Sequence, residues 1–192
     1  VRMERGLPPL IRPVNNGANI LKEGLAVVMK SDAANKLKKN LQPVQLGYGV
    51  PAGPEKMCHR VRAVLDSGKY TGAQTDAQNG FNAISREKVH EAIGERFKPA
   101  MKIFGTYYGM PSVHVCLYMY REEGNILIIR IILGKDGTRM RCLLGGTGFN
   151  TTVHHFIYEP IVVKFPTIKF NALTDDLPAL IPCPAITASQ DE

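Results

Sequence analysis

Several features that would assign this chain to a familiar class are missing from its 192 residues. There is no P-loop and no G-x-G-x-x-G motif, so no motif supports a nucleotide-binding enzyme of either of those types. There is no C-x-x-C pair, which argues against a zinc site. No apolar run is long enough to span a bilayer. We therefore expect neither a zinc cofactor nor a membrane partner.

Cysteine is scarce and scattered. The four cysteines, Cys58, Cys116, Cys142 and Cys183, lie far apart in the sequence. Because no secretory signal is visible, we interpret them as reduced, buried thiols of an intracellular protein, with disulfides as the alternative. The compartment stays open between the mitochondrion and the nucleus.

Positive charge is concentrated in the first third of the chain. The net charge is +7, and residues 1–62 hold 11 Lys/Arg against 4 Asp/Glu, whereas residues 63–192 hold 13 of each. A basic segment beside a neutral one suggests a polyanionic partner, most often nucleic acid. The alternative is a solvated basic surface. The candidate RNA-binding residues are Lys36, Lys38, Lys39, Arg60 and Arg62.

Hydrophobic periodicity and capping residues predict alternating helices and strands. We expect helices over residues 18–40, with Ser31 as an internal cap, from Pro54 onward, and over 85–97, 99–108 and 149–164, where Pro160 should kink or end the last one. We expect strands over 70–76, 112–120 and 125–133, and a β-hairpin over 168–181.

Three carboxylates fall at strand ends in this pattern. Asp76 ends the strand over 70–76, and Asp175 and Asp176 lie at or near the turn of the last hairpin. If those strands are neighbours in one antiparallel sheet, the carboxylates converge and need a cation between them. Mg²⁺, which prefers one or two carboxylates plus substrate phosphates, fits this need. The alternative is that the acids only form turns.

The order of several motifs resembles reverse transcriptases of the non-long-terminal-repeat and group II type. Residues 72–93, "GAQTDAQNGFNAISREKVHEAI", resemble motif A, and residues 173–177, "LTDDL", resemble motif C. Residues 10–14, "LIRPV", are similar to the R-P signature of the fingers, and residues 41–66 are similar to the segment upstream of motif A. Residues 137–146, "GTRMRCLLGG", lie where motif B belongs. The resemblance covers most of residues 10–181.

The resemblance implies catalytic roles for the three acids. Asp76 and Asp175 would be ligands of Mg²⁺ or Mn²⁺, with Asp176 beside them. Two such metal ions stabilise the attacking and leaving oxygens of phosphoryl transfer. If the chain is an enzyme, the resemblance makes it an RNA-directed DNA polymerase.

The resemblance also implies three nucleotide-binding residues. Phe81 would be the aromatic gate under the incoming sugar, with a core aromatic as the alternative. Arg12 would contact the triphosphate, or else be a surface arginine beside a proline. Gly145 would let the backbone approach template or nucleotide, or else be a loop glycine in a turn. His154 and His155 we interpret as helix residues without a catalytic role.

The chain departs from the family pattern in two places. Motif B carries Met140-Arg141 where Gln-Gly is usual, and the long charged side chain would enter the substrate path or bind phosphate instead. Only 16 residues follow Asp176, fewer than we expect for the rest of a palm and a thumb. No tryptophan, endonuclease pattern or zinc knuckle is present.

We therefore expect an α+β fold, a polymerase-type palm whose antiparallel sheet is flanked by helices, plus partial helical fingers. Residues 1–62 would form a basic, mainly helical fingers-like segment, residues 63–183 the palm, and residues 184–192 a flexible tail. The sequence favours a reverse-transcriptase-derived RNA-binding protein, a structural subunit of a larger ribonucleoprotein such as an organellar (mitochondrial) ribosome. Its partners would be RNA, including rRNA, and other protein chains. An active RNA-directed DNA polymerase domain fragment using two Mg²⁺ ions is the alternative.

Overall fold

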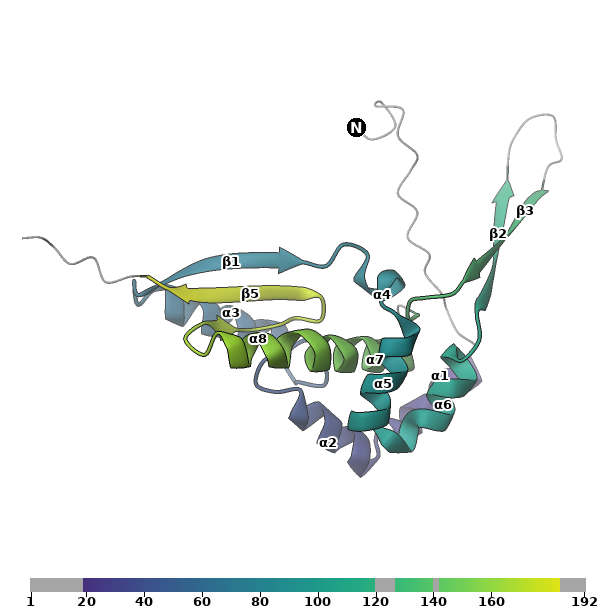
Figure 1. Ribbon diagram of the computed structural model, residues 1–192, viewed down its shortest axis with the longest axis horizontal. Coiled ribbons are helices and arrows are strands. Elements are labelled where there is room, and N and C mark those ends of the chain that lie inside the picture. Colours follow the sequence, from purple (N-terminus) through teal and green to yellow (C-terminus); the bar gives the residue numbers. More distant parts are fainter. Residues whose placement is uncertain (1–18, 120–126, 140–141, 184–192) are drawn as a thin grey trace, which may run out of the picture.

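The expected helical region over residues 18–40 forms two helices. A computed structural model describes residues 19–119, 127–139 and 142–183 of the chain (Figure 1). Helix α1 spans Asn19–Val28 and α2 spans Asp32–Asn40. Ser31 separates them because its backbone is extended and its hydroxyl accepts a hydrogen bond from the Ala34 amide, at 3.3 Å. Ser31 is therefore the predicted internal cap.

Helix α3, Gly53–Leu65, begins with a proline in its first turn, as predicted. Its apolar face carries Met57, Val61 and Val64, which are half-buried, while Leu65 is 38 % exposed. The rest of α3 is mostly exposed. This helix therefore covers the neighbouring strands only in part.

A three-stranded antiparallel sheet carries the predicted acids. Strand β1 spans Tyr70–Asp76, β4 spans Lys169–Phe170 and β5 spans Asp176–Pro182, in the order β1-β5-β4. Strand β1 begins and ends where the sequence predicted. Strands β4 and β5 form the predicted hairpin, with Phe170 paired to Ala179. Strand β1 lies at the edge of the sheet, exposed from Thr71 onward.

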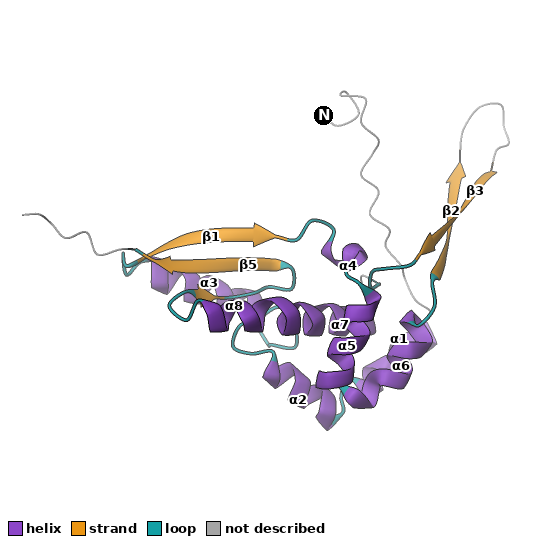
Figure 2. Ribbon diagram, viewed as in Figure 1, coloured by secondary structure: helices purple, strands orange, loops and turns teal. Residues whose placement is uncertain are grey.

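A second, two-stranded sheet stands apart from the first (Figure 2). Strands β2, Ser112–Met119, and β3, Leu127–Gly134, pair antiparallel as expected from the sequence. The turn predicted between them lies outside the described residues. Arg86 ties the base of this hairpin to the helices, because its guanidinium donates to the carbonyls of Gly137, at 2.9 Å, and Met110, at 2.8 Å, and to the Ser112 hydroxyl, at 2.9 Å.

The main hydrophobic core joins the N-terminal helices to those in the middle of the chain. Helix α5, Arg86–Arg96, is capped by Ser85 as predicted, and a short 3-10 helix (η2), Lys98–Ala100, leads into α6, Met101–Tyr108. The core residues are Leu25, Met29, Ala34, Leu37, Val89, Ile93, Phe97, Ala100, Phe104, Tyr108 and Leu144. Helices α1 and α2 thus share one core with α5 and α6, and the boundary predicted at residue 62 falls inside α3.

The last helical region starts earlier than predicted and continues past its proline. It consists of α7, Leu143–Val153, a π-helix (η3), His154–Tyr158, and α8, Glu159–Lys164. Pro160 lies in the first turn of α8, directly after the change from α to π winding and back, a feature of helices that often marks functional sites. The proline therefore accompanies a change of winding and does not end the helical region, which runs on to Lys164.

The described residues show helices and antiparallel strands, which is the coarse form of the predicted fold class. None of the described helices is long and apolar enough to cross a membrane. The prediction that the cysteines are buried is wrong for Cys58 and Cys183, which are exposed, while Cys142 is half-buried. Cys58 is exposed because α3 packs on the sheet with only one narrow face.

Candidate active site

The sheet brings the predicted acids together from opposite ends of the chain. In the register of β1 and β5, Asp76 is the direct partner of Asp176, although about a hundred residues separate them in the sequence. Directly opposed residues of an antiparallel pair point to the same face of the sheet. Asp175 precedes Asp176 in the turn. The pairing of β1 with β5 therefore brings the three acidic residues to one sheet end, and the metal-binding role implied for them stays a prediction.

The acids lie on a tight turn. The Leu173 amide donates to the Asp176 carbonyl at 2.8 Å, and the Asp176 amide donates to the Leu173 carbonyl at 3.2 Å, so Thr174 and Asp175 occupy the two central positions. Asp76 is exposed, and Asp175 and Asp176 are half-buried. Among the described residues, none of the three acids forms an ion pair. Within the described part of the chain, their negative charges are therefore not paired with a cationic side chain.

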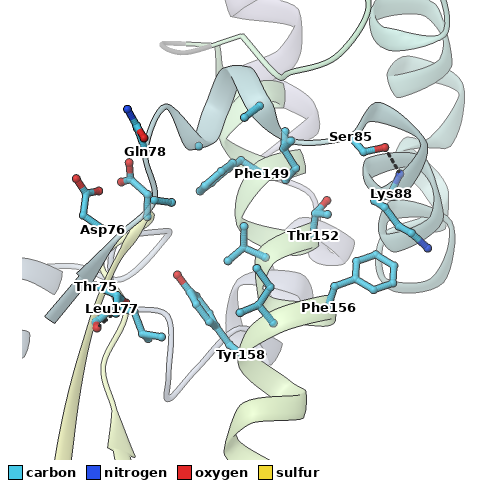
Figure 3. A pocket seen from close by; sticks show the side chains of 17 residues that line it. Thr75, Asp76, Gln78, Ser85, Lys88, Phe149, Thr152, Phe156, Tyr158 and Leu177 are labelled. Atoms are coloured by element: carbon cyan, nitrogen blue, oxygen red, sulfur yellow. Dashed lines mark hydrogen bonds between the residues drawn. The ribbon is translucent and has the colours of Figure 1, made fainter. Parts of the chain in front are cut away.

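A cleft of about 590 Å³ opens between the acid end of the sheet and the helices (Figure 3). Asp76 and Asp175 line it on the sheet side, and Phe149, Thr152 and Phe156 on the helix side. In Figure 3 the carboxylate of Asp76 points away from these helix side chains. The cleft therefore has an acidic rim and a largely apolar helical wall.

Tyr158 joins the helical wall to the acid turn. Its side chain is buried, and its hydroxyl donates to the Thr174 carbonyl at 2.9 Å. Burial raises the pKa of Tyr158, and the negative charges of Asp175 and Asp176 raise that pKa further. The phenol thus stays protonated and remains a hydrogen-bond donor to the turn at neutral pH.

Phe81 lies next to the cleft but is not one of the residues that line it. It belongs to a short helix, α4, Gly80–Ala83, and stacks on Phe149, with ring centroids 4.2 Å apart and an interplanar angle of 14°. Phe81 is half-buried, whereas Phe149 is almost fully buried and faces the cleft. In this arrangement the Phe81 ring supports the wall of the cleft.

Gly145 occupies the first turn of α7, not the loop that the resemblance implied. A Cβ at this position would lie 2.1 Å from the Arg139 carbonyl oxygen. Glycine is therefore favoured here by the close approach of the Arg139 backbone, and no approach of a template or nucleotide is needed to explain it. Met140 and Arg141, the altered pair of motif B, and Arg12 lie outside the described residues.

The predicted RNA-binding residues lie on α2 and α3 and differ in their exposure and hydrogen bonding. Lys36, Lys39 and Arg62 are exposed, and Arg60 is exposed while donating to the Pro43 carbonyl at 3.3 Å. Lys38 is half-buried, and its ammonium donates to the Met29 carbonyl, at 2.9 Å, after the end of α1. Lys38 therefore has a structural role that the sequence did not reveal.

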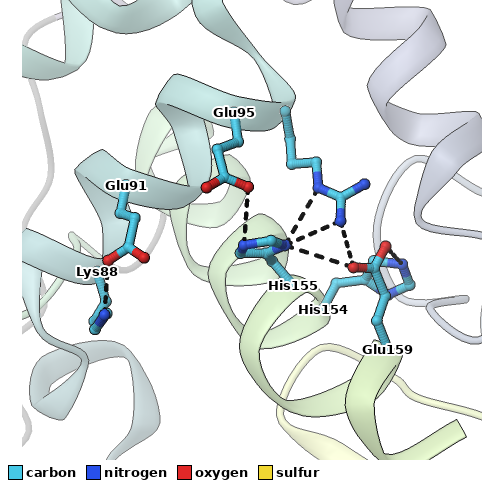
Figure 4. A network of polar contacts seen from close by, with 7 residues as sticks. Lys88, Glu91, Glu95, His154, His155 and Glu159 are labelled. Carbon is cyan, nitrogen blue, oxygen red and sulfur yellow. Dashed lines mark hydrogen bonds and ion pairs between the residues drawn. The ribbon is translucent and has the colours of Figure 1, made fainter. Parts of the chain in front are cut away.

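A polar network connects α5 to the π-helix (Figure 4). The His155 ring lies between Glu95, at 3.2 Å, and Glu159, at 3.5 Å, and Arg96 also pairs with Glu159. His154 is buried, and burial lowers its pKa, opposed by the nearby charge of Glu159. The network fixes the two helices together, which agrees with a structural reading of both histidines.

The residues present fit a metal that takes few protein ligands. Within residues 19–119, 127–139 and 142–183, no three His, Cys, Asp or Glu side chains are arranged to hold one metal ion. Mg²⁺ characteristically uses one or two carboxylates and completes its shell with waters and substrate phosphates. Asp76 and Asp175 both line the cleft, and the lysine that lines it with them, Lys88, is paired with Glu91, so the two acids suit that mode of binding.

Two residues of this site were missed by the sequence analysis. Tyr158 was hidden in a helical pattern whose winding the sequence does not reveal. Gln45, whose side chain contacts Thr174, lies in the segment upstream of motif A, where the quoted resemblance was the one available signal. Compared with known protein families and with curated proteins, the chain matches none.

Proposed function

We propose that this chain is the palm portion of a reverse-transcriptase-like polymerase, and that its reaction is RNA-directed DNA synthesis. The observation that carries the proposal is the pairing of Asp76 with Asp176 across β1 and β5, with Asp175 in the adjoining turn. A set of acids that serve only as turn-formers has no reason to meet from distant segments, because each could satisfy local backbone amides where it stands.

The proposed roles follow from the placement of each acid. Asp76 and Asp175 would hold Mg²⁺ or Mn²⁺, which when bound supplies charge stabilisation for the attacking and leaving oxygens of phosphoryl transfer. Asp176 keeps the negative potential high at the same sheet end. Strand β1 is exposed along most of its length, which leaves room for a nucleic acid to approach the acids from the solvent side.

A second candidate is the RNA-binding subunit that the sequence favoured. The observation in its favour is that Lys36, Lys39, Arg60 and Arg62 are all exposed on α2 and α3. Such residues would neutralise RNA phosphates and make binding weaken with salt. In this case the acids are retained from a polymerase ancestor, the changed Met140-Arg141 pair has ended nucleotide binding, and the chain serves a ribonucleoprotein such as a mitochondrial ribosome.

Primer extension separates the two candidates. The full chain is incubated with an RNA template, a DNA primer, dNTPs and Mg²⁺ or Mn²⁺, and is compared with Asp175→Asn and Asp76→Asn. Extension by the wild type that both variants lose supports the polymerase. Absence of extension, together with RNA binding that falls when Lys36, Lys39, Arg60 and Arg62 are changed to Glu, refutes it in favour of the RNA-binding subunit.

A further inference from the structure

The residue before Asp175 adopts a backbone conformation that is costly for its type. Thr174 has φ = 62°, and the other non-glycine residues with positive φ in the described chain are Ala52 and Asn79. Thr174 alone of these is β-branched, and positive φ is strongly disfavoured for β-branched side chains. Such strain persists only where the surroundings enforce it, typically at functional sites.

The side chain of Gln45 supplies that enforcement. Its carbonyl oxygen accepts from the Thr174 amide at 2.9 Å and from the Gly47 amide at 2.8 Å, and its amide nitrogen donates to the Thr174 carbonyl at 3.2 Å. The side chain therefore bonds both backbone polar groups of Thr174, as a neighbouring strand would. Gln45 is 0 % exposed, so no water competes for these hydrogen bonds.

The backbone around Gln45 is fixed to the same hairpin. The Leu46 amide donates to the Ala172 carbonyl at 2.7 Å, and the Ala172 amide donates to the Val44 carbonyl at 2.6 Å. Gly47 lies so close that a Cβ there would stand 2.6 Å from the Thr174 nitrogen. The carboxamide of Gln45 is thus held at a set position relative to the turn.

We propose that Gln45 is a positioning residue of the acid site: its carboxamide holds Thr174 in the left-handed conformation and thereby directs Asp175 into the cleft that it shares with Asp76. Tyr158 assists through its bond to the same Thr174 carbonyl. The inference rests on the proposed function in treating Asp175 as a metal-facing acid. A residue that only fills the core would not need both its donor and its acceptor directed at one strained residue.

A double-mutant cycle between Gln45→Met and Thr174→Gly tests this role. Methionine keeps similar bulk but offers no amide, and glycine adopts positive φ without steric cost. The readouts are the amide resonances of residues 173–177 in the full chain and their broadening by Mn²⁺, which reports the metal affinity of the acids. Gln42→Met, the same change at an exposed position of the same segment, is the control.

We expect Gln45→Met to shift the Asp175 and Asp176 amides and to weaken Mn²⁺ binding about ten- to hundredfold, as removal of a residue that orients a ligand does. In the Thr174→Gly background, Gln45→Met should weaken Mn²⁺ binding by about twofold or less, because glycine adopts the positive φ without the hydrogen bonds from Gln45. Gln42→Met should leave both readouts unchanged.

Three results would overturn the proposal. The first is Gln45→Met with unshifted amides at the turn. The second is an equal loss of Mn²⁺ affinity in both backgrounds. The third is failure of Gln45→Met to fold in either background, which would make Gln45 a core residue only. If Gln45→Met unfolds alone but folds with Thr174→Gly, the proposal is supported. If Mn²⁺ does not broaden the amide resonances of residues 173–177 in the wild type, the polymerase function is refuted. The amide shifts caused by Gln45→Met then still show whether Gln45 holds the conformation of the turn.

Discussion

The opposition of Asp76 and Asp176 predicts that the acid site lowers the stability of the metal-free protein. The two residues are direct partners across β1 and β5, and no ion pair to any described residue relieves them. Like charges placed opposite each other in an antiparallel pair are destabilising by up to about 1 kcal/mol. Because Asp76 is exposed, solvent screening reduces this to about 0.5 kcal/mol. Asp76→Asn, which keeps the shape, should therefore stabilise the metal-free chain.

The effect is measurable as a melting temperature with and without Mg²⁺. For a chain of this size, about 0.5 kcal/mol corresponds to a Tm increase of about 1–2 °C. Mg²⁺ at ten times its Kd should stabilise the wild type by about 1.4 kcal/mol, or about 3–6 °C, and should leave Asp76→Asn almost unchanged. Addition of Mg²⁺ should thus reverse the order of the two Tm values.

Asp66→Asn is the matched control. It removes the same charge at the end of α3, before β1 begins and at the end of the strand opposite to Asp76, so this variant should keep the full response to Mg²⁺. The reasoning is wrong if Asp76→Asn lowers the metal-free Tm by more than about 2 °C, or if its Mg²⁺ response equals that of the wild type. The first result would mean that Asp76 is a structural acid, and the second that the metal binds elsewhere.

Three further predictions concern the framework around the site. Arg86→Leu leaves three acceptors without their donor, two of them in buried hydrogen bonds, and should cost about 3 kcal/mol in denaturant unfolding. Arg62→Leu, on an exposed face, should change stability by less than about 0.5 kcal/mol; equal effects would contradict the clamp at the base of the β2–β3 hairpin. Gly145→Ala drives a Cβ against the Arg139 carbonyl and should destabilise the chain by about 1–3 kcal/mol. Gly146→Ala, at a position with open space for a Cβ, should stabilise it by up to about 1 kcal/mol; a stabilising Gly145→Ala would contradict the close contact with Arg139. The pKa of His154 is lowered by burial below its ordinary 6.5, so the unfolded state binds more protons and stability should fall as pH drops from about 7 to 5; His154→Gln should flatten this slope in thermal melts at stepped pH, and an unchanged slope would assign it to other groups.

The proposed function differs from the one that the sequence favoured, and the register of β1 and β5 is the reason. From the sequence, the altered motif B weighed against a polymerase. The structure adds the direct pairing of Asp76 with Asp176 and a cleft beside Asp175. An RNA-binding subunit needs neither, so the acid site now carries the proposal while RNA binding is kept as the second candidate.

Local elements were predictable where one residue's chemistry decides the backbone. Ser31 and Ser85 were identified as caps because a hydroxyl can satisfy the unpaired amides of a first helical turn, and both do so. The end of β1 at Asp76 and the final hairpin followed from alternation and from polar residues at the turn. These signals span a few residues, so no tertiary information is needed to read them.

Features that depend on contacts between distant segments were not predictable. The exposure of Cys58 depends on how little of α3 the sheet covers. Lys38 was expected to be free for RNA, but it bonds a carbonyl after the end of α1.

The sequence by itself determined which acids lie at strand ends and in a hairpin turn, because alternating apolar residues mark the strands and turn-forming residue types mark the turn. Only the tertiary structure decided that Asp76 faces Asp176, since an antiparallel register is set by the pairing of two strands and not by either alone. It alone also decided that Gln45, more than a hundred residues before the turn, holds the strained Thr174. A buried amide finds its partners only once the chain has folded around it.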